Sequence, residues 1–265
     1  MEAWGFNPTR NRPKRIGLYP RTVAPDTLPQ APIAPGFTPN ITTHHETGLQ
    51  FQIYRSVSTR HQAGCPTSQF PTRWTLPARW YTFDFPTHKP LIHFIVLDSN
   101  MPRADGTWQH GHDFTLKPEE QAEQLHWFET QLQKPRTTPY LGVLGHHPIY
   151  SNGPHGDHPV LIREWDTLFR KYKVDLYMAG HDHDLQHLEL EGHPTTHFLS
   201  GGGGADLYVL KVDGLDRGPY AQQVHGFSHL SVTPKSLELR HLDADGRLLY
   251  GITRTPAGIV KPLGT

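Results

Sequence analysis

Near-continuous apolar runs and amphipathic segments alternate along the middle of the chain. The apolar runs occupy residues 80–85, 91–97, 138–144, 174–179 and 196–200. Runs of this length are typical of strands that are covered on both faces of a sheet. Two longer segments, at 118–132 and 159–173, place their apolar residues at helical spacing instead. The order strand, helix, strand, helix, strand predicts an α/β fold.

Both predicted helices begin at a proline, which is tolerated in the first turn because its missing N–H would have no partner there. Pro118 begins the first helix and Pro159 begins the second. The residues expected to face the core are Ala122, Leu125, Phe128 and Leu132 in the first helix, and Leu161, Trp165, Leu168 and Phe169 in the second.

The pattern changes to strict alternation in the last quarter of the chain. Residues 227–232, 236–242 and 247–253 alternate apolar and polar side chains, which predicts three half-buried strands. Asp245-Gly246 is a typical two-residue turn and predicts a hairpin between the last two strands. We expect one folded domain over residues 71–256 and a tail over 257–265.

The first 70 residues have neither periodicity. Eight prolines lie between Pro8 and Pro39 and interrupt every candidate element, because proline lacks a donor and is excluded from helix interiors. We expect a largely irregular Pro/Arg-rich leader over residues 1–70, with one short strand at 49–54 where the residues alternate.

Composition excludes several classes of function. The formal net charge is +0, so we expect neither nucleic acid nor a membrane surface as a partner. Cys65 is the single cysteine and cannot form an internal disulfide. No apolar run reaches transmembrane length, and residues 1–8 contain no apolar stretch of a secretory signal. The location of the protein is left open by these features.

Histidines follow two of the predicted strands directly after a glycine. The first strand leads into Gly145-His146-His147-Pro148, and the next leads into Gly180-His181-Asp182-His183. In α/β folds, ligands bind at the carboxyl ends of parallel strands. His146, His181 and His183 are therefore expected to converge, and imidazoles that converge on one point can bind a metal ion. With 20 histidines in the chain, chance pairs occur, but the matching strand-glycine context favours a site.

Two other features at strand ends have simpler interpretations. Asp98 follows the run at 91–97, and we expect it to cap the loop through local hydrogen bonds. The four glycines at 201–204 permit close backbone approach, but no Lys-Ser/Thr pair follows them as in a P-loop. An ordinary loop is the better interpretation.

The stretch from about Arg73 to Arg254 resembles the calcineurin-like metallophosphoesterases, and within them the purple or tartrate-resistant acid phosphatase branch. The resemblance is carried by residues 73–81, Gly145-His146-His147-Pro148, Tyr150-Ser151, His155-Gly156, Gly180-His181-Asp182-His183-Asp184-Leu185-Gln186 and Leu199-Ser200-Gly201. It implies a β-sandwich flanked by helices, with two metal ions at the sheet ends, and a metal-dependent phosphomonoester hydrolase in which metal-bound hydroxide attacks phosphorus.

By the same resemblance, His146 and His181 bind the divalent ion and His183 binds the other ion. The expected metals are iron, with zinc or manganese as alternatives. His155 corresponds to the histidine that binds the phosphate or protonates the leaving alkoxide, and is the expected catalytic residue. His147 is expected to line the substrate pocket. The expected substrate is a small-molecule or protein phosphomonoester, and relatives of this type are usually secreted or periplasmic.

The family pattern also includes an amino-terminal βαβ half that supplies a bridging Asp, an Asn ligand and a tyrosinate. We find none of its motifs in this sequence. Without a bridging carboxylate, two close cations repel strongly, so we expect one metal ion at most. Three interpretations follow from the sequence: an acid phosphatase with impaired activity, a truncated remnant that binds one metal without turnover, and an unstable fragment with an open sheet edge.

Overall fold

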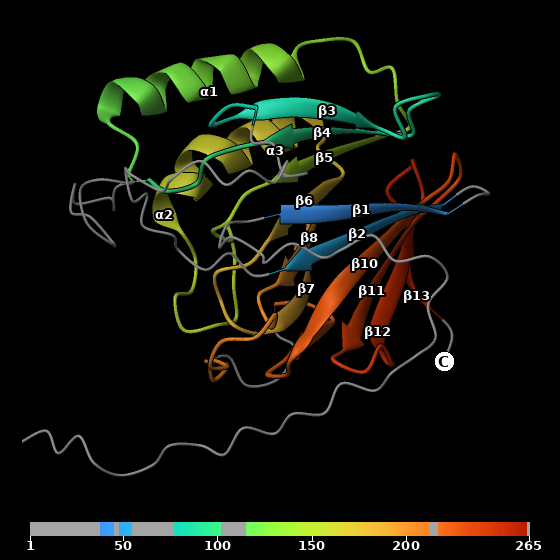
Figure 1. Cartoon of the computed structure of the whole chain (residues 1–265). Coiled ribbons are helices and arrows are strands. Elements are labelled where there is room, and N and C mark those ends of the chain that lie inside the picture. Colours follow the sequence, from blue (N-terminus) through green and yellow to red (C-terminus); the bar gives the residue numbers. More distant parts are fainter. Residues whose placement is uncertain (1–37, 45–47, 55–76, 102–114, 212–216, 264–265) are drawn as a thin grey trace, which may run out of the picture. The chain divides into compact units, whose positions relative to one another are not determined.

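A computed structural model describes residues 38–44, 48–54, 77–101, 115–211 and 217–263 (Figure 1). Strands β1 (Thr38–His44) and β2 (Gly48–Tyr54) form an antiparallel hairpin. The strand expected at 49–54 is therefore confirmed as β2. The rest of the proposed leader lies outside the described residues, so the domain boundary at residue 70 stays a prediction.

A mixed seven-stranded sheet forms the centre of the described fold, in the order β3-β4-β5-β6-β8-β7-β9. Its four central strands are parallel, and β3, β7 and β9 pair antiparallel at the two sides. The bounds are β3 (Tyr81–Phe85), β4 (Ile92–Val96), β5 (Tyr140–Leu144), β6 (Leu176–Ala179), β7 (Leu185–Glu189), β8 (Thr196–Ser200) and β9 (Tyr220–Gln222).

A second, antiparallel sheet contains β10 (Gly226–Val232), β11 (Leu237–Asp243), β12 (Leu248–Arg254) and β13 (Val260–Pro262). The three alternating segments form strands as expected, and Gly246 takes a φ of 82° in the turn between β11 and β12. The expected tail adds a fourth strand. Gly258 has a φ of 81° and reverses the chain, so that Val260 pairs with Arg254.

The helices are α1 (Pro118–Leu132) and one continuous helical run made of α2 (Pro159–Leu161), the π-helical turn η1 (Ile162–Asp166) and α3 (Thr167–Tyr172). The expected core face of the second helix is confirmed. In α1 the expected face was wrong at Ala122, which is exposed, while Gln124 is fully buried. Gln124 accepts from the Asp98 N–H and donates to the Asp98 carbonyl, so it satisfies the backbone at the end of β4.

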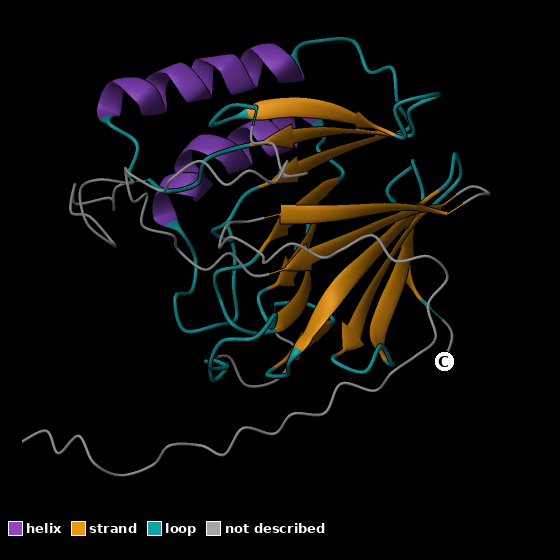
Figure 2. Ribbon diagram, viewed as in Figure 1, coloured by secondary structure: helices purple, strands orange, loops and turns teal. Residues whose placement is uncertain are grey.

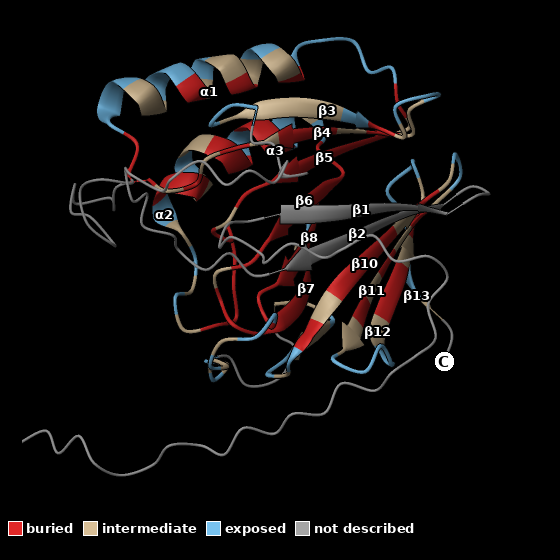
Figure 3. Ribbon diagram, in the orientation of Figure 1, coloured by how far each residue is buried: buried red, intermediate tan, exposed pale blue. Residues whose placement is uncertain are grey.

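Two apolar cores lie on opposite faces of the central sheet (Figures 2 and 3). Successive residues of each parallel strand point to opposite faces, so Ile95 packs with the helices while Phe94 packs with the second sheet. Both faces are therefore covered, which explains why the parallel strands are nearly continuous apolar runs. The result is a mixed α/β fold, with helices on one face of a β-sandwich. Within the described ranges, no helix has the length and apolarity to cross a bilayer.

Candidate active site

The site is built where the parallel strands end. β4, β5, β6 and β8 run in one direction, so the segments after Val96, Leu144, Ala179 and Ser200 meet at one edge of the sheet. Backbone hydrogen bonds continue past the strands and fix these loops together. The Gly180 N–H donates to the His146 carbonyl at 3.0 Å, and the Gly145 N–H donates to the Met178 carbonyl at 3.1 Å. The two histidine loops are therefore held side by side.

Gly145 is required by a buried tyrosine beneath the first loop. A β-carbon at position 145 would lie 2.4 Å from the Tyr177 hydroxyl oxygen. That hydroxyl is fully buried and donates to the His147 carbonyl at 2.6 Å. The Tyr177 hydroxyl thus occupies the space that a side chain at position 145 would need, and it holds the loop through its hydrogen bond. This packing explains why a glycine precedes the histidines.

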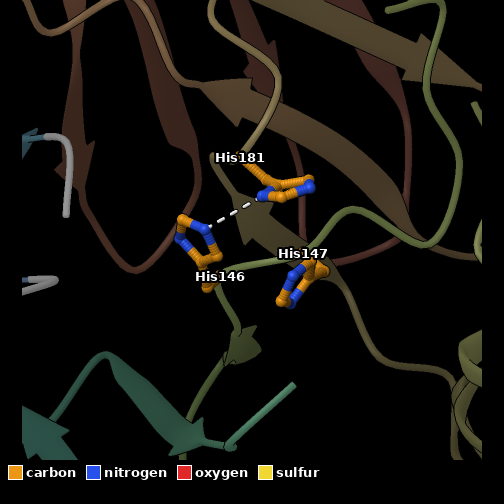
Figure 4. Close-up of side chains that lie close together, drawn as sticks. All are labelled: His146, His147 and His181. Atoms are coloured by element: carbon orange, nitrogen blue, oxygen red, sulfur yellow. Dashed lines mark hydrogen bonds between the residues drawn. The ribbon is translucent and has the colours of Figure 1, made fainter. Parts of the chain in front are cut away.

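His146 and His181 face one another across the two loops (Figure 4). His146 Nε2 and His181 Nδ1 are 3.1 Å apart. Two ligands with bonds of 2.0–2.1 Å at a tetrahedral angle are about 3.3 Å apart, so this spacing fits one metal ion. His181 has a φ of 67°, a left-handed conformation that few non-glycine residues adopt. The pair therefore meets the expectation that these imidazoles converge.

His147 completes a group of three whose candidate ligand atoms lie within 4.8 Å of one another (Figure 4). Ser99 determines which ring nitrogen of His147 carries the proton. The Ser99 oxygen accepts from the backbone N–H groups of His146 and His147 at 3.0 and 2.8 Å, which uses both of its lone pairs. Its own proton then goes to His147 Nδ1 at 2.9 Å. In the neutral ring the remaining proton is on Nε2, so His147 presents a donor, which suits an anion better than a metal.

Replacing Ser99 by alanine is expected to lower the free energy of unfolding by about 2 kcal/mol. Ser99 is 1% exposed, so its loss leaves two buried backbone N–H groups without an acceptor. Urea denaturation measures the effect. Ser200→Ala is the matched control, because the Ser200 hydroxyl is equally buried and has no hydrogen-bond partner among the described residues. Equal losses in both variants would contradict the role of Ser99 as an acceptor.

His155 lies beside the metal-type pair and is oriented by Asp182. Its ring centroid is 4.1 Å from that of His181, and His155 Nδ1 is 2.5 Å from Asp182 Oδ1. A carboxylate only accepts, so Nδ1 carries the proton. Asp182 is fully buried and also accepts from the Ser151 hydroxyl. A β-carbon on Gly153 would lie 2.4 Å from this carboxylate, so the glycine makes room for it.

His183 lies apart from the group of three. Its Nδ1 donates to the Asp206 carbonyl at 2.6 Å, and its ring stacks on Tyr208 with centroids 3.7 Å apart. Because the carbonyl fixes the proton on Nδ1, Nε2 is the nitrogen that can bind a metal. This carbonyl contact is the usual support of a metal-bound histidine. The expectation that His183 converges on one point with His146 and His181 was wrong, because His147 occupies that position in the group of three. The assignment of His183 to another ion stays a prediction.

Carboxylates near the site are engaged in other interactions. Asp98 pairs with Arg79 at 2.8 Å and accepts from the Asn100 N–H at 2.9 Å, which confirms it as a loop cap. Burial, with a smaller contribution from the charge of Asp182, raises the pKa of Asp184 to about 7, although Gln186 donates to it. In the described ranges, the group around His146, His147 and His181 contains imidazoles alone.

Several residues that shape the site were missed by sequence reasoning. Ser99, Asp182 and Tyr208 position or contact His147, His155 and His183. For Asp182 a signal existed, because it lies between two histidines at a strand end. Ser99 and Tyr208 are far from the histidines in sequence, and only the fold brings them close.

The family assignment follows from this arrangement and from comparison with known proteins. Residues 72–185 match the sequence model of the family described as calcineurin-like phosphoesterase. The chain carries a calcineurin-like phosphoesterase domain. The phosphoesterase domain is homologous to the tartrate-resistant and purple acid phosphatases. Tartrate-resistant acid phosphatase type 5 of Mus musculus is 28% identical over 199 residues, which are 69% of this chain and 59% of the mouse protein. The chain thus spans about three fifths of such relatives.

Two solved structures share the fold of the phosphoesterase domain. GAP50, described as the anchor in the inner membrane complex of Plasmodium, matches with a TM-score of 0.55 and 21% identity over 67% of this chain and 55% of that chain. A purple acid phosphatase from yellow lupin (Lupinus luteus) seeds matches with a TM-score of 0.53 and 21% identity over 69% of this chain and 34% of that chain. The expected metallophosphoesterase-type fold is confirmed.

Proposed function

We propose that this chain is a metal-dependent phosphomonoester hydrolase of the acid phosphatase type. Homology supports hydrolysis of a phosphoester in general. One observation carries the more specific proposal: a metal-type pair, His146 and His181, lies directly beside an Asp-oriented histidine, His155. Hydrolysis of a phosphomonoester needs these two parts, a cation to neutralise the phosphate and a proton donor for the leaving oxygen.

Each residue of the site then has a stated task. His146 and His181 hold one ion. His183, whose Nδ1 donates to the Asp206 carbonyl, would bind another ion through Nε2. A bound ion supplies Lewis acidity, which neutralises the phosphate charge and lowers the pKa of water. His147 donates its Nε2 proton to a phosphate oxygen. His155 turns Nε2 toward the substrate, because Nδ1 is fixed by Asp182, and delivers a proton to the leaving alkoxide when the ring is charged.

Hydrolysis of p-nitrophenyl phosphate by the purified chain tests the proposal. The protein is first stripped with a chelator and then given Fe, Zn²⁺ or Mn²⁺, at pH values from 4 to 8. We expect turnover that requires metal, and a fall in kcat of about 10²–10⁴-fold in His155→Ala, the usual contribution of a general acid. His126→Ala is the control, because His126 is an exposed histidine on the surface of α1. Absence of turnover with every metal would refute the proposal.

A second function is favoured by the donor set itself. The described group consists of imidazoles, without a carboxylate to bridge two cations, which suits one ion rather than two. A protein that binds one ion without turnover is therefore the alternative. The fold does not decide between the two, since a Plasmodium protein with this fold is described as an anchor. One metal per chain in the site, lost in His181→Ala, together with no hydrolysis, would support the alternative.

A further inference from the structure

A second cluster of metal-type side chains lies between the helical run and the central sheet. Asp166 ends the π-helical turn, His193 lies in the turn between β7 and β8, and His197 lies within β8. One ligand atom from each residue lies within 4.8 Å of the other two. The rings of His193 and His197 both contact the ring of Tyr150, with centroids 5.5 and 5.3 Å away. None of these residues has a task in the proposed hydrolysis.

The ligand atoms of this cluster are buried, and among the described residues their one mutual contact is the ion pair between His193 Nδ1 and Asp166 Oδ1 at 3.4 Å. They are Asp166 Oδ1, His193 Nδ1, and both ring nitrogens of His197. His197 is fully buried, and Asp166 is 5% exposed. Buried polar atoms without partners are rare in folded proteins, because each one loses its hydrogen bonds to water and gains none in the protein. Both ring nitrogens of His197 lack a partner among the described residues, and they lie beside the His193–Asp166 pair, so one cation could satisfy all three side chains.

The spacing and chemistry of these atoms fit a tetrahedral cation. His193 Nδ1 and Asp166 Oδ1 are 3.4 Å apart, close to the edge of about 3.3 Å expected between two ligands of one zinc ion. Two imidazoles and one carboxylate are a frequent donor set for zinc, with a fourth position left for water. Burial lowers the pKa of His193 and of His197, so both rings are neutral, which is the form that binds metal.

The local backbone also indicates a site. η1 is a π-helical turn inserted between two α-helical segments, and Asp166 is its last residue. Such turns are uncommon and occur often at functional sites. The wider turn shifts the phase of the helix at Asp166, while Trp165 before it and Leu168 after it stay in the apolar core. The carboxylate is thereby buried against the sheet next to two histidines.

Arg170 partners the cluster from outside without using the unsatisfied atoms. Its Nε donates to Asp166 Oδ2 at 2.8 Å, and its terminal nitrogen contacts His193 Nε2. A histidine that binds metal through Nδ1 carries its proton on Nε2, and that proton would face the guanidinium protons. His193 therefore cannot bind a metal through Nδ1 and accept a hydrogen bond from Arg170 at Nε2 at the same time. The Arg170 side chain is 47% exposed and can turn toward solvent, so it competes with a metal rather than preventing its binding.

We propose that Asp166, His193 and His197 form a zinc site, separate from the strand-end histidines, that fastens the helical run to β8. Arg170 is its competitor. The ion would join two segments, the helical run that carries Asp166 and the segment from His193 to His197, and it would hold Tyr150, which belongs to the same loop as His146 and His147. The site is therefore structural, and it does not depend on whether the chain hydrolyses phosphoesters.

Zinc binding to the purified full chain tests this site. Zn²⁺ content is measured after dialysis, and Co²⁺ serves as a spectroscopic probe, because tetrahedral coordination gives it strong visible absorption. Asp166→Asn and His193→Gln are expected to weaken one zinc site by more than about 100-fold, since loss of a group that merely orients a ligand already costs 10–100-fold. His146→Ala must keep this zinc, which separates the cluster from the strand-end histidines.

Two further variants keep the test decisive if a ligand variant folds poorly. Arg170→Gln removes the competitor and is expected to tighten zinc binding severalfold, a gain that a damaged fold would not give. Glu164→Gln changes another carboxylate of η1 and is expected to leave zinc binding unchanged. Zinc content that is the same in wild type, Asp166→Asn and His193→Gln would overturn the proposal. So would unchanged or weaker binding in Arg170→Gln.

Discussion

Replacing Gly201 by alanine is expected to lower the free energy of unfolding by about 3 kcal/mol or more and to disorganise the second histidine loop. A β-carbon at position 201 would lie 1.6 Å from the Asp182 carbonyl oxygen and 2.7 Å from its carbon. Both atoms belong to the backbone, so no side-chain rotation relieves the overlap. The Gly201 N–H also donates to the Asp184 carbonyl at 2.9 Å, which fixes β8 against this loop.

Gly180→Ala is the matched control for this prediction. Gly180 lies in the same loop pair, but the nearest atoms to a β-carbon there are 3.7 and 4.0 Å away, which is ordinary contact. We expect a change within about 1 kcal/mol, as for most substitutions without a clash. Denaturant unfolding followed by tryptophan fluorescence measures both variants, and metal binding reports on the loop. If Gly201→Ala were as stable as Gly180→Ala, the close approach of the two backbones would be refuted.

The sequence was a good guide to the central strands because their environment is uniform. β4, β5 and β6 are covered on both faces, so each residue is apolar and the run is visible without knowledge of the fold. Pro118 and Pro159 likewise indicate the first turns of the helices by local chemistry alone. The prediction failed at Ala122 and did not include the buried Gln124, because periodicity treats a buried position as apolar. Gln124 is buried to satisfy the backbone of Asp98, and that contact is set by tertiary structure.

In the site as well, features set by local sequence could be predicted, and features set by tertiary contacts could not. His146 and His181 could be paired from the sequence because each follows a strand and a glycine, and parallel strands end at one edge. The proton on each ring could not be predicted, because it is set by residues from elsewhere in the chain. Ser99, which follows β4, determines which ring nitrogen of His147 carries the proton. The Asp206 carbonyl does the same for His183. In the cluster of Asp166, His193 and His197 the two histidines are close in sequence, but Asp166 belongs to another segment and only the fold brings it to them.

The contribution of Asp184 to the stability of the metal-free chain is expected to increase as the pH falls from 8 to 5. Burial raises the pKa of Asp184 from its ordinary value of 3.8 to about 7. The folded state therefore holds this proton more tightly than the unfolded state does. Its contribution to stability is fully present below pH 4 and is lost as the pH rises through 7. A shift of this size corresponds to roughly 4 kcal/mol.

Asp184→Asn isolates this effect, because asparagine has the shape of the protonated side chain but does not titrate. With a chelator present, urea unfolding at several pH values should show the variant to be more stable than wild type at pH 8 by about 2 kcal/mol or more. The difference should shrink toward zero at pH 4. Asp245→Asn, at a side chain that is 67% exposed, should follow the wild-type curve at every pH. A difference between Asp184→Asn and wild type that does not change with pH would mean that Asp184 is ionised throughout, and that its hydrogen bonds from Gln186 outweigh its burial.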